Sequence, residues 1–120
     1  MISIRGATTV ESNCTEEIKE KSIELFNKII TVNELAIDKI HTIIFSCTDD
    51  ITKAYPGGFV REYYNLNTMS IMHYNEMKVE NSLKFCIRIL VLSNEEKVSA
   101  KFVYLHNAKT LRKDLLSEQF

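Results

Sequence analysis

The stretch FCIRILVL at residues 85–92 decides how the rest of the chain is arranged. Its β-branched and apolar residues are typical of a buried strand. Arg88 stands in the middle of this stretch, and arginine stays protonated in proteins. Removing a charge from water costs on the order of several kcal/mol unless the charge is paired. Four interpretations are therefore open: Arg88 faces solvent, pairs with a carboxylate of the same chain, lies at an interface between subunits, or binds an anionic ligand.

The remaining elements are predicted from periodicity and from cap residues. Apolar or alternating runs predict four further strands, at residues 2–7 (continuing toward residue 10), 40–47, 68–73 and 101–105. One long helix is predicted at residues 15–32, with Thr15 as its N-cap and Asn33 at its end. Pro56 suits the first turn of a second, shorter helix. A short element is predicted at residues 108–111.

This order of elements predicts an α+β fold, in which a mixed β-sheet packs against one long helix. Ile18, Leu25 and Ile29 share one face of that helix and would lie on the sheet. The chain has no second long helix to cover the other face of the sheet. Oligomerisation is the natural way to cover it.

Composition limits the classes of function. With 120 residues and a formal net charge of -1, the chain is expected to form one domain, and its charge suggests no nucleic-acid or membrane partner. No apolar run approaches membrane-spanning length, and the first residues lack the apolar core of a signal peptide. Cys14, Cys47 and Cys86 have neither metal nor redox spacing. We therefore expect reduced thiols and a cytoplasmic protein.

The motifs indicate neither a catalytic triad nor a metal site. His41, His73 and His106 have no Cys or Asp partner at a recognisable spacing, and the pair at residues 49–50 has no further carboxylate at a matching spacing. We therefore expect no metal and no cofactor. The chain instead offers several cations and one suitably placed acid, Glu76. That combination suits binding and polarising a polyanion without covalent chemistry.

Seven short motifs, taken in order, resemble the AroH-class, monofunctional chorismate mutases. They are IRGATTVE at 4–11, AYP at 54–56, VRE at 60–62, EM at 76–77, CIR at 86–88, VYL at 103–105 and LR at 111–112. The resemblance covers residues 1–115, which we expect to form one domain, followed by a mobile tail at 116–120. It implies a homotrimeric pseudo-α/β-barrel with active sites at the subunit interfaces. A trimer agrees with the uncovered face of the predicted sheet.

The resemblance also implies an activity, the Claisen rearrangement of chorismate to prephenate on the route to phenylalanine and tyrosine. It implies three catalytic residues, Arg88, Glu76 and Arg5. Arg88 would lie at the ether oxygen and a carboxylate of the substrate, and Glu76 would accept the ring hydroxyl. Arg5 and Tyr104 would hold a substrate carboxylate. Negative charge builds on the ether oxygen in the transition state, so a fixed cation there stabilises the transition state more than the substrate.

Further substrate contacts are implied from other parts of the chain. Tyr55 and Arg61 match positions that a neighbouring subunit contributes, and Leu111 and Arg112 match a mobile C-terminal segment that closes over the site. The full substrate-binding set implied by the resemblance is Arg5, Tyr55, Arg61, Met72, His73, Tyr74, Asn75, Glu76, Arg88, Tyr104, Leu111 and Arg112.

The chain departs from the family pattern at four positions. His73 stands where the family commonly has cysteine, and we expect its imidazole to bond near Glu76 and to titrate near neutral pH. A rate that depends on pH below about pH 7 would follow. Gly58 replaces a lysine, which removes a positive charge from the rim of the site. Ser70 and Lys113 replace prolines, so the loop and the tail are expected to be looser.

Two other functions remain as alternatives. One is a non-catalytic or regulatory module that binds small molecules on the same trimeric scaffold. The other is a small-molecule deaminase of the similarly folded reactive-imine family, which rests on analogy of fold alone. The presence of Arg5, Glu76, Arg88 and Tyr104 together favours catalysis. Turnover of chorismate separates the enzyme from both alternatives.

Overall fold

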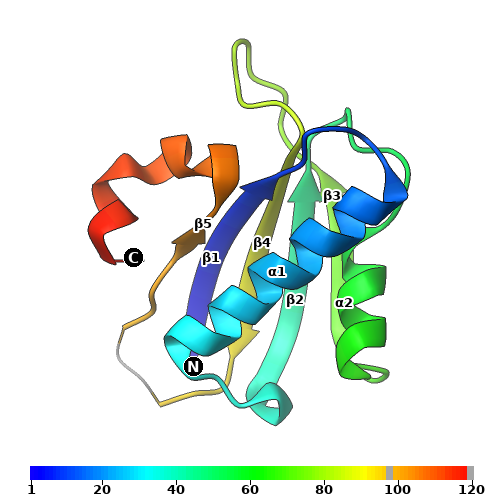
Figure 1. Ribbon diagram of the computed structural model, residues 1–120. Helices are drawn as coiled ribbons and strands as arrows, with labels where there is room; N and C mark the ends of the chain where they lie inside the picture. The colour runs from blue at the N-terminus through cyan, green and yellow to red at the C-terminus, as the bar shows by residue number, and fades with distance from the viewer. Residues whose placement is uncertain (97–98, 119–120) are drawn as a thin grey trace.

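The computed structural model describes residues 1–96 and 99–118, with side chains described up to residue 112. These residues form a five-stranded mixed sheet in the order β3-β2-β4-β1-β5, and two helices lie on one of its faces (Figure 1). The strands are β1 (Ile2–Thr9), β2 (Ile40–Cys47), β3 (Ser70–Asn75), β4 (Cys86–Ser93) and β5 (Val103–Tyr104). The helices are α1 (Thr15–Asn33), α2 (Pro56–Tyr64) and the 3-10 segments η1 (Ile37–Lys39) and η2 (His106–Glu118). The predicted α+β fold with one long helix is confirmed.

The predicted strand around Arg88 is the central strand, β4. It pairs antiparallel with β1 on one side and with β2 on the other, while β5 and β3 extend the sheet in parallel. β4 begins one residue later than predicted, because Phe85 has a φ of 51°, which is incompatible with a strand. Ile87, Ile89 and Val91 are buried in the core, and the residues between them point to the opposite face.

Helix α1 ends one residue beyond the predicted range of 15–32, and its predicted N-cap is wrong. Cys14, not Thr15, is the N-cap residue, and its side chain makes no capping bond. The Glu17 carboxylate instead accepts hydrogen bonds from the backbone N–H of Glu11 (2.6 Å) and from Ser12 Oγ (3.2 Å). A carboxylate in the first turn also suits the positive end of the helix. The buried residues of α1 are Ile18, Ser22, Leu25, Phe26, Ile29 and Asn33.

β5 is much shorter than the strand predicted at 101–105, and the reason is a side chain of α1. The Asn33 amide accepts a hydrogen bond from the Lys101 N–H (2.7 Å) and donates one to the Lys101 carbonyl (2.9 Å). Both backbone groups of Lys101 are thereby used, and only Val103–Tyr104 pair with β1.

Two further elements differ from their predicted ranges. β3 spans Ser70–Asn75 rather than residues 68–73, and it starts later because residues 66–69 close a turn through the Met69 N–H and the Leu66 carbonyl. The C-terminal element extends over His106–Glu118 and is kinked at Arg112, which has φ -139° and ψ 64°. Residues 119–120 lie outside the described residues, so the mobility of the tail at 116–120 remains a prediction.

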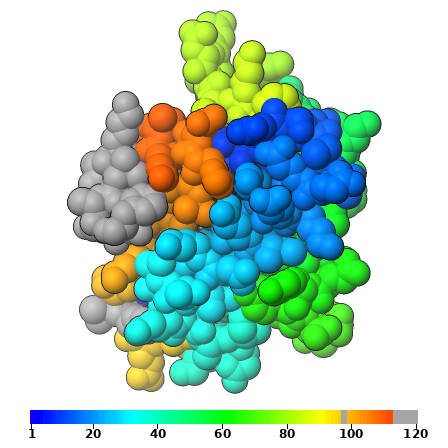
Figure 2. Space-filling view, in the orientation of Figure 1, coloured from blue at the N-terminus to red at the C-terminus, as the bar shows by residue number. Residues whose placement is uncertain are grey.

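The two faces of the sheet differ in what covers them. Helices α1 and α2 lie side by side over one face, where the main hydrophobic core forms (Figures 1 and 2). We call this the helix face. The opposite face carries residues such as Ile44, Leu90 and Leu92, which are only partly buried. We call it the open face. It corresponds to the sheet face for which the sequence predicts no covering helix.

Candidate active site

The register of the sheet places one row of side chains across all five strands. Arg88 of β4 stands opposite Ala7 of β1 and Ser46 of β2, and the row continues outward to the edge strands. Because strand neighbours of these residues, such as Ile87 and Phe45, are buried in the core, the row lies on the open face. In order, the row is Tyr104, Ala7, Arg88, Ser46 and Tyr74.

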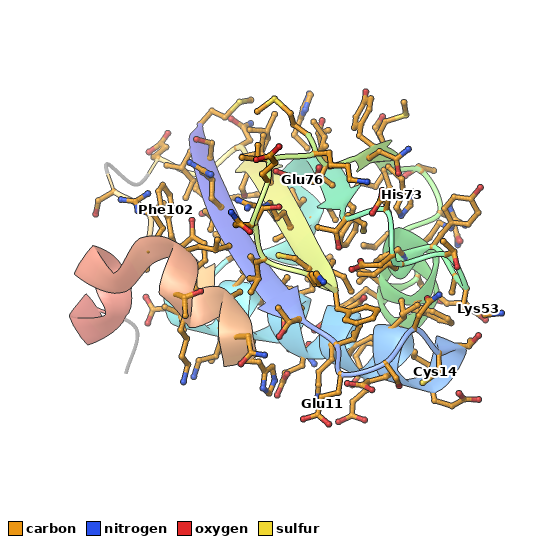
Figure 3. All side chains as sticks on the ribbon, turned by 90° about the horizontal axis from the view of Figure 1, so that it is seen from above. Glu11, Cys14, Lys53, His73, Glu76 and Phe102 are labelled. Carbon is orange, nitrogen blue, oxygen red and sulfur yellow. The ribbon has the colours of Figure 1, made fainter. Side chains whose placement is uncertain are left out.

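Glu76 lies beside this row and pairs with Arg88. It follows β3 directly, and its backbone N–H donates to the Cys47 carbonyl (2.8 Å), which fixes its main chain to β2. One carboxylate oxygen, Oε2, is 3.3 Å from Arg88 Nε, and the other, Oε1, accepts a hydrogen bond from Ser46 Oγ at 2.6 Å. Figure 3 shows Glu76 on the side of the sheet away from α1. Of the four interpretations of Arg88, pairing with a carboxylate of the same chain is confirmed.

The contact between Arg88 and Glu76 is an electrostatic attraction that does not fix the orientation of the two side chains. Arg88 Nε is buried and has no hydrogen-bond partner, so its N–H does not point correctly at Glu76 despite the short distance. The two side chains remain 29% and 25% exposed. The pair is therefore half-desolvated and retains access to a ligand from the open face.

One hollow borders each member of this pair. A small hollow of about 180 Å³ is lined by Arg5, Ile44, Ser46, Arg88, Ile89 and Leu90. A larger one of about 720 Å³ lies under the loop after β3 and is bordered by Glu76. Arg5 is exposed and stands opposite Leu90 in the register, so it is two residues along β1 from the Arg88 row. Arg5, Glu76 and Arg88, the three predicted catalytic residues, therefore share one face of the sheet.

Comparison with known proteins identifies the family. A sequence profile described as chorismate mutase type I matches residues 1–115. The chain is 35% identical over 114 residues to chorismate mutase AroH of Bacillus subtilis, covering 93% of this chain and 90% of that protein. It is 34% identical over 119 residues to chorismate mutase AroH of Thermus thermophilus, covering 97% of each. The chain belongs to the type I chorismate mutase family.

A solved structure of the same family agrees with this fold. A chorismate mutase from Clostridium thermocellum superimposes with a TM-score of 0.87 at 35% identity, covering 92% of this chain and 99% of that one. The resemblance stated from the sequence motifs is thereby confirmed for the fold and for the family. Neither the regulatory module nor the deaminase is supported by these comparisons.

Tyr104 and the C-terminal segment lie at the β5 end of the row. Tyr104 is 2% exposed and packs with Ala7, Cys86 and Ala108 in a second, smaller core cluster, against which Leu111 also packs. Arg112 lies at the kink of η2. The ring and the hydroxyl oxygen of Tyr104 are both buried, so its contact with substrate stays a prediction.

Three predicted site residues of this family member lie at α2 and not beside Arg88. Tyr55 precedes α2 and is 73% exposed, and Arg61 is exposed on the helix. His73 is on the helix face of β3, where its Nε2 accepts a hydrogen bond from the Gly57 N–H (2.9 Å) and its ring stacks on Phe45 at a centroid distance of 5.4 Å. Tyr55, Arg61 and His73 therefore lie near one another at α2, and none of them lies in the Arg88 row.

The expectation that His73 bonds near Glu76 is therefore wrong, and so is the expected pKa. His73 of β3 contacts α2 on the helix face, whereas Glu76, which directly follows β3, contacts Arg88 on the open face. Burial, and next the positive charge of Arg61, hold the pKa of His73 below its ordinary value of 6.5. The imidazole is thus neutral around pH 7, with the Gly57 bond requiring a lone pair on Nε2.

Met72, Tyr74 and Asn75 complete the predicted set on β3. Met72 (51% exposed) and Tyr74 (54% exposed) project from the open face at the edge of the sheet. Asn75 borders a hollow of about 410 Å³ that also includes Tyr55 and His73. Met72 and Tyr74 therefore leave two large exposed side chains at this edge of the open face.

Ser46 is the site residue that sequence reasoning missed. It lies between Arg88 and Tyr74 in the row and bonds directly to Glu76. The signal was present, because Ser46 is a polar residue in the apolar strand stretch 40–47, at a position of opposite parity to Phe45.

Among the described residues, the cysteines near the row are not activated as thiolates, and no metal centre forms there. Burial raises the pKa of Cys47 to about 12 and that of Cys86 to about 11, although the Arg88 charge opposes the shift at Cys86. All three cysteines are free thiols. Within residues 1–96 and 99–118, no three metal-ligating side chains gather, and no helix is long and apolar enough to cross a membrane. The site offers charge and hydrogen bonds only.

Proposed function

We propose that the protein catalyses the rearrangement of chorismate to prephenate, an intramolecular isomerisation, and that it needs no cofactor. The observation that carries the proposal is the half-buried Arg88–Glu76 pair beside a hollow on the open face. Membership of the type I chorismate mutase family supplies the substrate. A cytoplasmic location stays a prediction from the sequence.

The charges suit a reaction in which an ether bond breaks and charge separates. Arg88 would stand at the ether oxygen, where negative charge accumulates, and Arg5 would hold a carboxylate of the substrate. Glu76 would accept the ring hydroxyl and balance the positive charge that develops on the ring. Because both ionic groups are fixed before the reaction, they stabilise the transition state without reorganising. No bond to the protein is required.

We further propose that the working unit is a homotrimer with active sites between subunits. Ile44, Leu90 and Leu92 leave an incompletely buried apolar stripe along the open face, and a second copy would cover it. Tyr55 and Arg61 lie on the α2 side of their own sheet, so a site on the open face would receive them from another copy. Both features support a shared site.

Two measurements test these proposals. The purified protein should remove the ultraviolet absorbance of chorismate, and light scattering should give three times the chain mass of 13.9 kDa. A folded protein without turnover would refute the enzymatic assignment, and binding of prephenate in that case would favour the regulatory module. A monomer with full activity would refute the interface site.

A further inference from the structure

The Glu76 carboxylate is held by two different neighbours, one at each oxygen. Arg88 approaches Oε2 and Ser46 Oγ donates to Oε1, so the two contacts come from adjacent strands, β4 and β2. The last torsion of a glutamate side chain is broad and does not by itself fix the plane of the carboxylate. Whatever sets that plane decides which oxygen lone pair faces a bound ligand.

Of these two neighbours, only Ser46 makes a directional bond. The Arg88 Nε–H has no hydrogen-bond partner, so its contact with Glu76 is electrostatic. The Ser46 bond is 2.6 Å long, a length typical of a hydroxyl bonded to a charged oxygen. Ser46 is itself held in place, because it lies on a strand paired on both sides. The Ser46 hydroxyl, carried on this paired strand, therefore fixes the orientation of the Glu76 carboxylate.

We propose that Ser46 is a positioning residue, which orients Glu76 so that Oε2 is shared between Arg88 and the substrate. The inference rests on the proposed function, since it assigns Glu76 to the reaction. Ser46 itself need not touch the substrate. Its hydroxyl occupies Oε1 and so leaves Oε2 as the oxygen that faces the charged end of Arg88. Losing it would let the carboxylate rotate while the ion pair persists.

The test compares Ser46→Ala with Ser46→Thr. Ser46→Ala removes the hydroxyl, and we expect kcat to fall by about tenfold to a hundredfold, with a smaller change in KM, because misplacement of a reacting group has effects of that order. Ser46→Thr keeps the hydroxyl and adds a methyl group that the neighbouring hollow can accept, so it should retain kcat within about threefold. Thr42→Ala, which removes a hydroxyl elsewhere on β2, is the matched control and should leave kcat unchanged.

A cycle with Glu76→Ala separates positioning from a structural role. If Ser46 acts through Glu76, adding Ser46→Ala to Glu76→Ala should lower kcat no further. Multiplicative losses, or equal losses in Ser46→Ala and Ser46→Thr, would overturn the positioning role while leaving the enzymatic assignment intact. An inactive wild type would instead overturn the proposed function and this inference with it. Far-ultraviolet circular dichroism and light scattering confirm that each variant is folded and assembled.

Discussion

Ile43 and Ile44 are adjacent on β2, yet they meet different surroundings. Ile43 is fully buried beneath the helices, whereas Ile44 is partly buried and lines the hollow beside Arg88. The same contrast runs along β4, where Ile87 and Ile89 are buried in the core and Arg88 between them pairs with Glu76. The helix face and the open face are thus built from alternate residues of the same strands.

The helix face therefore contributes mainly to the stability of the fold, and the open face contributes mainly to ligand chemistry. On the helix face, apolar area removed from water stabilises the fold at roughly 25 cal/mol per Å². On the open face, charged groups such as Arg88 and Glu76 stay partly solvated, and their value lies in what they do to a ligand. Substitutions on the two faces should therefore alter different measurements.

The largest expected effect on activity is from Arg88→Ala. Removing this cation should lower kcat/KM by at least 10²–10³, equivalent to roughly 3–4 kcal/mol of transition-state stabilisation, because no other described charge lies against Glu76 Oε2. The rate of chorismate loss measures it. Arg88→Lys is the matched control, since it retains the charge without the planar fork, and it should recover only part of the rate. A decrease of less than tenfold in Arg88→Ala would contradict the role of this charge.

The largest expected effect on stability is from Ile43→Ala. Deleting a fully buried Ile side chain leaves a cavity, and we expect a loss of about 2–5 kcal/mol in the free energy of unfolding, measured by denaturant titration. Ile44→Asp is its counterpart on the open face. This substitution should leave the circular dichroism spectrum of the folded protein unchanged. It should lower the mass measured in solution to that of a single chain. Equal losses in the free energy of unfolding for Ile43→Ala and Ile44→Asp would show that both faces contribute equally to stability.

Gly57 and Gly58 should respond to alanine with opposite signs. A Cβ on Gly57 would lie 2.6 Å from Ile71 Cγ2 and 2.8 Å from the His73 ring, whereas a Cβ on Gly58 would meet only Tyr55 Cβ at 3.9 Å. We expect Gly57→Ala to destabilise the protein by about 1–3 kcal/mol. Gly58→Ala should stabilise it by about 0.5–1 kcal/mol, because alanine favours a helix. Thermal unfolding of both variants checks the pair, and a stabilised Gly57→Ala would disprove the close packing of α2 on β3.

Much of the fold could be predicted because periodicity reports which face of an element is buried. The β2 range at residues 40–47 was predicted without error, and α1 differs by one residue. The errors fall where tertiary contacts override the local pattern. Asn33 binds the backbone of Lys101 and shortens β5, although nothing near Lys101 in the sequence indicates this. Single-sequence patterns do not contain such long-range bonds.

For the site, the residue types could be read from the sequence and their roles from the resemblance, but neither indicated which face of the sheet each side chain occupies. The structure brings Arg5, Glu76 and Arg88 to one face, as a common site requires. Ser46 was missed because its importance comes from a bond to a residue thirty positions away. His73 was expected near Glu76 because it stands where the family commonly has cysteine, yet the alternation of side chains along β3 places it on the helix face.

The smallest expected effect concerns His73 and pH. Burial and the nearby charge of Arg61 lower its pKa in the folded state, so between that pKa and the unfolded value of 6.5 the unfolded chain binds more protons. The stabilising contribution of neutral His73 is therefore complete above about pH 6.5 and is lost as the pH falls through this window. The bond from Gly57 disappears when Nε2 is protonated.

His73→Asn provides the comparison, because an amide does not titrate and can still accept a hydrogen bond. As the pH falls below 6.5, the free energy of unfolding of the wild type should decrease more steeply than that of His73→Asn. His41 and His106 are present in both proteins, so their contributions cancel in the difference. Because His73 does not face Glu76, kcat should stay flat around pH 7 rather than show the dependence expected from the sequence. Parallel stability profiles for the two proteins would mean that the pKa of His73 is not lowered by folding, and that α2 does not bury it as tightly as the Gly57 contact requires.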